Sequence, residues 1–113
     1  MNTSEEKSSI GYLIDPESRL ITVVRVADFK DIQKHLECDI FTTVRALENG
    51  DTLYVDDMSL ISGKPQEFFM FEGYPSPIAG RGLLLGATPD GADADCETNV
   101  VDAAMLVEWL ERV

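Results

Sequence analysis

Two adjacent carboxylates, Asp56 and Asp57, follow the apolar stretch TLYV and are the first candidates for chemistry in the chain. Paired carboxylates act either as an acid–base pair or as ligands of a divalent metal. TLYVD is typical of a β-strand, in which adjacent side chains point to opposite faces. The two carboxylates then converge on one metal only if a bulge re-aims one of them. The pattern therefore predicts that the pair marks the end of a strand.

A second group of carboxylates lies in an acidic loop, at Asp90, Asp93, Asp95 and Glu97. If this were an EF-hand loop beginning at Asp93, Thr98 would replace the required glycine and Ala104 the bidentate glutamate. The loop therefore predicts no dedicated calcium site. A small metal-dependent enzyme that uses Asp56, Asp57 or this loop is kept as an alternative.

Outside these two groups of carboxylates, the sequence contains only weak signals for a nucleophile, a zinc site or a phosphate-binding loop. His35 is the only histidine and follows Asp31 by four residues, a spacing that favours a solvent-facing ion pair on a helix. Cys38 and Cys96 have acidic neighbours and no C-x-x-C spacing, which favours reduced thiols over a disulfide or a nucleophile. The glycines of IAGRGLLLG flank a strand, whereas a nucleotide-binding fingerprint opens a helix. We therefore predict no catalytic residue, no metal and no cofactor.

Short strands dominate the elements that would position these residues. Strand patterns occupy about 10–14, 20–26, 40–47, 52–56, 66–71 and 82–87. Asp15-Pro16-Glu17-Ser18 and Glu48-Asn49-Gly50-Asp51 read as the tight turns of two hairpins.

Two helices are predicted. The first runs from about Asp28, its cap, to Glu37, with an apolar stripe of Phe29, Ile32 and Leu36. The second begins at about Val100, capped by Asn99, and runs towards residue 113. Its buried face is expected to hold Val100, Ala103, Val107 and Leu110, widened by Leu106 and Trp109.

This order of elements predicts an α+β fold, an antiparallel or mixed β-sheet with two helices packed on it. At 113 residues and 44% apolar residues, the chain is expected to form one domain over residues 10–113. Residues 1–9 are polar and are expected to be a disordered tail rather than a signal peptide. We expect no membrane span and a cytoplasmic location.

Charge is the most informative bulk property. Twenty-one acids and nine bases give a net charge of −12. Residues 1–47 hold eight acids and six bases, whereas residues 48–113 hold thirteen acids and three bases. Such a field repels nucleic acids and anionic membranes and attracts basic surfaces. Solubility alone is the simpler explanation.

The stretch FFMFEGYP, residues 68–75, is the main apolar candidate for an interface. Its aromatic and Met side chains lie on both faces of a strand. Either the fold buries both faces, or one face meets a partner. Phe69, Phe71 and Tyr74 are therefore candidate partner-binding residues.

Three segments carry a resemblance to a known family: LIDPESRLITVV, DTLYVDD, and IAGRGLLLG followed by PDG. On these segments the chain resembles small proteins of unknown function found in phages, plasmids and bacterial mobile elements. Met58 and Ser59 stand where that family usually has a glycine after the paired acids. The resemblance implies no activity and no functional residues, but it implies the setting of a mobile-element accessory gene.

Together these features predict a non-enzymatic acidic protein that binds a basic protein partner. In the implied setting, the partner would be a host defence protein, such as a CRISPR effector or a restriction enzyme, blocked by mimicry of nucleic-acid charge. A plain homodimeric module associating through residues 68–74 is a further alternative. The predicted partner-binding residues are Asp90, Asp93, Asp95, Glu97, Glu108, Glu111, Phe69, Phe71 and Tyr74.

Overall fold

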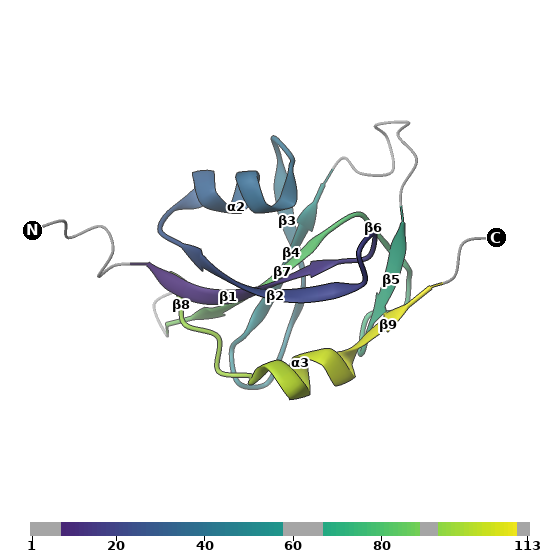
Figure 1. The fold of residues 1–113 in the computed structure, drawn as a ribbon. Coiled ribbons are helices and arrows are strands. Elements are labelled where there is room, and N and C mark those ends of the chain that lie inside the picture. The colour runs from purple at the N-terminus through teal and green to yellow at the C-terminus, as the bar shows by residue number, and fades with distance from the viewer. Residues whose placement is uncertain (1–7, 58–66, 89–92, 111–113) are drawn as a thin grey trace, which may run out of the picture.

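The structure, a computed structural model, describes residues 8–57, 67–88 and 93–110. These residues form two antiparallel sheets and two helices (Figure 1). The elements are β1 (Ser9–Asp15), β2 (Leu20–Val26), α2 (Phe29–Leu36), β3 (Phe41–Ala46), β4 (Thr52–Asp56), β5 (Phe68–Phe71), β6 (Ile78–Ala79), β7 (Gly82–Ala87), β8 (Asp93–Ala94), α3 (Val100–Leu106) and β9 (Val107–Trp109).

The larger sheet has the strand order β2-β1-β7-β4-β3, with β8 paired to the end of β7. The smaller sheet has the order β6-β5-β9. Every pairing among the described strands is antiparallel. An α+β fold built on an antiparallel sheet with two helices, as predicted, is therefore confirmed.

The central strand β7 explains how the core is divided. Its side chains alternate, so Leu84 faces one side of the sheet and Leu83 and Leu85 face the other. Leu83 and Leu85 pack with Ile32 and Leu36 of α2. Leu84 belongs to the larger cluster, which is completed by Tyr12, Ile14, Leu53, Val55, Phe69, Phe71, Ile78 and Ala103. The two helices accordingly lie on opposite sides of the large sheet (Figure 1).

The predicted turns and caps are confirmed in detail. The Asp15 carboxylate accepts a hydrogen bond from Glu17 N at 3.0 Å, which closes the turn between β1 and β2. Asp28 caps α2 by accepting from Lys30 N and Asp31 N. Asn99 caps α3 by accepting from Asp102 N. Gly50, at φ 95°, provides the left-handed residue of the β3–β4 hairpin.

The predicted final helix is wrong beyond Leu106. Val107 has an extended backbone, and Val107–Trp109 pair with β5 in the smaller sheet. Val and Trp favour strands, and the pairing gives β5 a second neighbour. Of the four residues predicted on the buried helix face, only Ala103 is a core residue; Val100 is exposed.

Three smaller predictions also need correction. Phe29 was placed on the buried stripe of the first helix, but its ring is exposed. His35 was expected to pair with Asp31; instead His35 Nε2 lies 3.1 Å from Arg25 O, and Asp31 accepts from Ala27 N. Residues 1–7 of the predicted tail lie outside the described residues, but Ser9 already begins β1.

Candidate partner-binding surface

The paired carboxylates Asp56 and Asp57 mark the end of a strand, as predicted. β4 ends at Asp56, and Asp57 N donates to Ile40 O at 3.0 Å. Asp56 is half-buried and Asp57 is exposed. Within the described ranges, no three His, Cys, Asp or Glu side chains are grouped so that they could hold a metal ion.

Carboxylates of the predicted acidic loop are exposed, but they also hold the chain in place. Asp93 lies in β8 and accepts from Tyr54 OH at 3.4 Å. Asp95 accepts from Ile10 N at 2.8 Å, and Cys96 N donates to Ile10 O at 2.8 Å. The segment around β8 therefore bridges the ends of β7 and β1. Asp90, predicted with these residues, lies outside the described residues.

A fully buried carboxylate that the sequence analysis missed lies at the start of β4. Asp51 accepts from Glu97 N at 2.9 Å, from Thr98 N at 2.8 Å, and from the Thr98 hydroxyl at 2.5 Å. The Cys96 thiol donates to the same carboxylate at 3.1 Å. We call this set, Asp51 with Cys96, Glu97 and Thr98, the Asp51 clamp.

The electrostatics of the clamp fix its protonation state. Burial alone would raise the pKa of Asp51, but the hydrogen bonds from Thr98, Glu97 and Cys96 outweigh it and lower that pKa. Burial, and then the Asp51 carboxylate, raise the pKa of the Cys96 thiol. Asp51 is therefore ionised and Cys96 protonated at neutral pH, which gives each hydrogen bond a donor and an acceptor.

The second cysteine is equally unsuited to nucleophilic chemistry. Burial, followed by the charges of Asp56 and Asp39, raises the pKa of Cys38 to about 11. Both cysteines are free thiols. Cys38 packs against the cluster beneath α2 and Cys96 against the larger cluster, so they lie on different sides of the large sheet.

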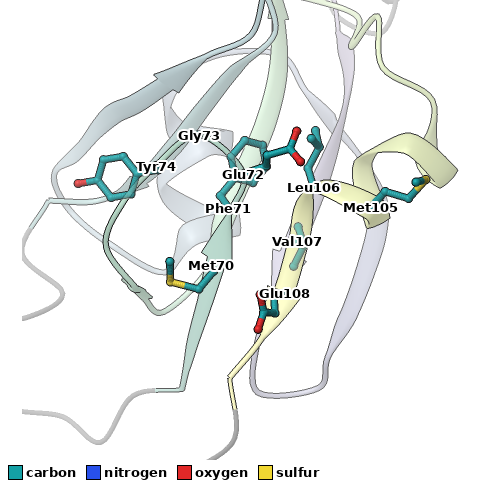
Figure 2. A pocket seen from close by; sticks show the side chains of 9 residues that line it. All are labelled: Met70, Phe71, Glu72, Gly73, Tyr74, Met105, Leu106, Val107 and Glu108. Atoms are coloured by element: carbon teal, nitrogen blue, oxygen red, sulfur yellow. The ribbon is translucent and has the colours of Figure 1, made fainter.

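A pocket of about 320 Å³ lies where α3 passes into β9 beside the end of β5. We call it the β5–β9 pocket. Figure 2 shows Met105 on α3 at one end of the set and Tyr74 at the other, with Glu72 between them. Met70 and Glu108 lie side by side because they are directly opposite in the pairing of β5 and β9. The lining residues are Met70, Phe71, Glu72, Gly73, Tyr74, Met105, Leu106, Val107 and Glu108.

Backbone hydrogen bonds fix the shape of this pocket. Glu72 N donates to Leu106 O at 2.8 Å, which holds the end of β5 against the last turn of α3. Tyr74 N donates to Phe71 O at 3.0 Å and closes the turn after β5. The turn and the break between α3 and β9 thus form opposite walls.

Some of the predicted partner-binding residues line this pocket, and others are buried in the core. Tyr74 and Glu108 line it. Phe69 is fully buried, so the prediction that its ring contacts a partner is wrong. Phe71 is 1% exposed and contributes only to the floor. Glu111 lies outside the described residues. Asp93, Asp95 and Glu97 are exposed in the segment held by the Asp51 clamp, apart from the pocket lining.

The pocket-lining residues that were not among the predicted partner-binding residues include Met70, Glu72 and Met105. Met70 and Glu72 both lie within the predicted interface stretch of residues 68–75. The sequence pattern could not place Met105 at the pocket. A continuous helix to the end of the chain would not have brought this residue beside the turn after β5. The break between α3 and β9 is what assembles the pocket.

The charge asymmetry of the sequence persists among described residues. Between residues 48 and 110, the structure describes eleven Asp and Glu residues and one basic residue, Arg81. Arg81 already pairs with Asp15 at 3.6 Å and with Glu37 at 3.7 Å. The exposed acids of this half include Asp57, Asp93, Asp95, Glu97, Asp102 and Glu108.

Comparison with known proteins places the chain in a family of unknown function. The family described as "Domain of unknown function (DUF3846)" matches residues 9–108, so the chain belongs to this family. A relative from Sinorhizobium fredii (strain NBRC 101917 / NGR234), the "Uncharacterized protein y4iR", is 29% identical over 100 residues. The match covers 86% of this chain and 61% of that relative, so the chain spans about three fifths of the relative's length.

No solved structure matches the chain. Among the residues that the structure describes, no helix has the length and apolar character needed to cross a membrane.

Proposed function

We propose that this protein is a non-enzymatic binding module whose acidic surface engages a basic protein partner. One observation carries the proposal: of the eleven carboxylates described from residue 48 onward, eight are exposed, against a single cation that is already paired within the fold. A field of one sign attracts a surface of the opposite sign and accelerates the encounter.

The net negative charge of the chain is larger than solubility requires, and such a charge would allow the protein to mimic a nucleic acid. DNA carries about one negative charge per 1.7 Å of its axis, and the grooves that bind it are lined with Lys and Arg. An acidic folded domain that occupies such a groove excludes the nucleic acid. The proposal therefore extends to a nucleic-acid-binding partner in the cytoplasm, and, from the resemblance to mobile-element proteins, to a host defence protein such as a CRISPR effector or a restriction enzyme.

The test is capture from a nuclease-treated bacterial lysate, with the native chain and an Asp93→Asn, Asp95→Asn, Glu97→Gln variant as parallel baits. Asn and Gln keep a carbonyl oxygen as acceptor, so the contact of Asp95 with Ile10 N can survive while the charge is removed. We expect basic nucleic-acid-binding proteins on the native bait, fewer of them on the variant, and their release when double-stranded DNA is added. Captured proteins that DNA does not displace would refute mimicry, and equal capture by the two baits would refute a charge-driven surface.

A further inference from the structure

We propose that the β5–β9 pocket, with the adjoining exposed face of α3, docks an amphipathic, positively charged segment of the partner protein. Apolar side chains of the segment contact Met70 and Met105, and its Lys or Arg side chains lie beside Glu72 and Glu108. This inference rests on the proposed function and adds the surface and the kind of segment through which binding occurs.

The lining of the pocket combines polar groups with apolar side chains. Phe71, Leu106 and Val107 provide a floor that belongs to or packs against the larger apolar cluster. Met70 and Met105 also line the pocket, and methionine side chains are flexible and polarisable, so they adapt to different contacts. Met and aromatic residues are also enriched in the cores of protein interfaces.

The apolar surface continues beyond the pocket, which favours a segment over a small molecule as the occupant. Met105 is 77% exposed and Val101 is 67% exposed. They are four residues apart on α3 and therefore share one face of the helix. A small molecule in a pocket of about 320 Å³ would leave Val101 uncovered, whereas a segment lying along α3 covers both side chains.

The charges at the edge of the pocket indicate whether the docked segment is positively or negatively charged. Glu72 and Glu108 line the pocket, and Asp102 is exposed on α3 between Val101 and Met105 in sequence. None of the nine residues that line the pocket is basic. A positively charged segment complements this rim. A second copy of the chain, with a net charge of −12, does not.

An apolar floor with acidic residues at its edge matches the general mode in which an amphipathic basic helix lies in a groove. In that mode, apolar side chains spaced three or four residues apart enter the groove, and flanking Lys and Arg side chains face the acidic edge. The exposed pair Val101 and Met105 has the matching spacing along α3.

The test is an NMR titration of the protein labelled at its methionine methyl groups. The probe is a synthetic peptide of Leu and Lys patterned as an amphipathic helix, and the control peptide contains Lys alone at the same net charge. We expect the Met70 and Met105 signals, assigned through Met70→Leu and Met105→Leu, to shift with the first peptide, while those of Met1 and Met58 do not. The Lys-only peptide should bind more weakly and leave the methyl signals nearly unchanged.

Three variants complete the test. Glu108→Gln should weaken binding of the Leu–Lys peptide about two- to fivefold, as for a partly screened surface charge. Met105→Ser should weaken it about fivefold or more through lost apolar contact. Glu48→Gln, an exposed acid in the β3–β4 hairpin, is the matched control and should change little.

The outcomes separate this inference from the proposed function. Binding without shifts at Met70 and Met105, equal effects of Glu108→Gln and Glu48→Gln, or equal binding of the two peptides would overturn the docking site and leave a charge-driven function standing. Shifts of the Met70 and Met105 signals that appear when the protein alone is concentrated would show that a second copy of the chain occupies the pocket. This result would also overturn the docking proposal. Failure of both peptides to bind at low salt would overturn the docking site and the charge-driven function together.

Discussion

The Asp51 clamp and the β5–β9 pocket place the same chemical group in opposite environments. In the clamp, a fully buried carboxylate accepts four hydrogen bonds and joins the start of β4 to residues 96–98. In the pocket, the Glu108 carboxylate is exposed beside Met70 on the surface of the smaller sheet. The first carboxylate holds two distant parts of the chain together, and the second is available to another molecule.

The difference teaches that net charge overstates the surface available to a partner. Asp51, Asp93 and Asp95 all count towards the −12, yet each accepts a hydrogen bond within the fold. Buried charge is tolerated only where hydrogen bonds replace water, and Asp51 meets that condition. The following predictions test this division between structural and partner-facing carboxylates.

The largest effect is expected for Asp51→Asn. The amide nitrogen of Asn cannot accept a hydrogen bond, and the variant loses the charge that strengthens the remaining ones. We expect a loss of about 3 kcal/mol in the free energy of unfolding, measured by urea denaturation. Asp57→Asn, just beyond the other end of β4, is the control and should change stability by no more than about 0.5 kcal/mol. Similar values for the two variants would contradict the division.

Trp109→Ala tests the other region, where apolar contact rather than a buried carboxylate anchors the late part of the chain. The half-buried indole of Trp109 packs edge-to-face on Phe69 with ring centroids 6.4 Å apart. Because the ring is only partly buried, we expect a loss of about 2 kcal/mol, below the range for fully buried aromatic residues. Chemical denaturation measures it. A loss under about 1 kcal/mol would show that β9 is held by backbone pairing alone.

The stability contributed by Asp51 should depend on pH with a definite sign. Its pKa is lowered in the native state, so the unfolded chain binds more protons between the two pKa values. The contribution is complete above the unfolded pKa, about 3.9, and is lost as the pH falls through the native pKa. We expect the difference between the native chain and Asp51→Asn to be constant from about pH 7 to pH 5 and to shrink below about pH 4. A difference that disappears near neutral pH would mean that burial, not hydrogen bonding, controls this carboxylate.

A small effect on stability is expected for the Asp93→Asn, Asp95→Asn, Glu97→Gln variant. All three side chains are exposed, and the substitutions keep an acceptor for Ile10 N. The loss should stay below about 1 kcal/mol, as for exposed charged groups. A larger loss by urea denaturation would show that these charges maintain the contact between β8 and its neighbours, and binding data from the variant would then report on folding.

Local chemistry in the sequence was sufficient for much of the fold. Asp28 and Asn99 identified the helix starts, Asn49-Gly50 identified a hairpin, and the apolar run of Leu83–Leu85 identified a strand. Each of these features is decided by residues within a few positions of one another, which is why a sequence pattern can reveal it.

The missed elements depend on distant partners. β6, β8 and β9 have two or three residues each, and each exists because it pairs with β5 or β7. Asp51 is different, because its burial could have been predicted from the sequence. Residues 51, 53 and 55 point to the same side of an extended chain, and Leu53 and Val55 are buried in β4. The β5–β9 pocket could not be predicted from the sequence, because it forms only where the chain leaves α3 for β9.

The central claim, that exposed carboxylates of the later half attract a basic partner, is tested most directly by surface plasmon resonance with a protein captured as described above. The native chain and the Asp93→Asn, Asp95→Asn, Glu97→Gln variant would be compared across a salt series. We expect association of the native chain to slow steeply with added salt, because charges more than about 8 Å apart are screened at physiological ionic strength. The variant should lower the association rate more than it raises the dissociation rate, since charges at the edge of an interface act mainly by steering. Binding that is independent of salt and unaffected by the variant would contradict the claim.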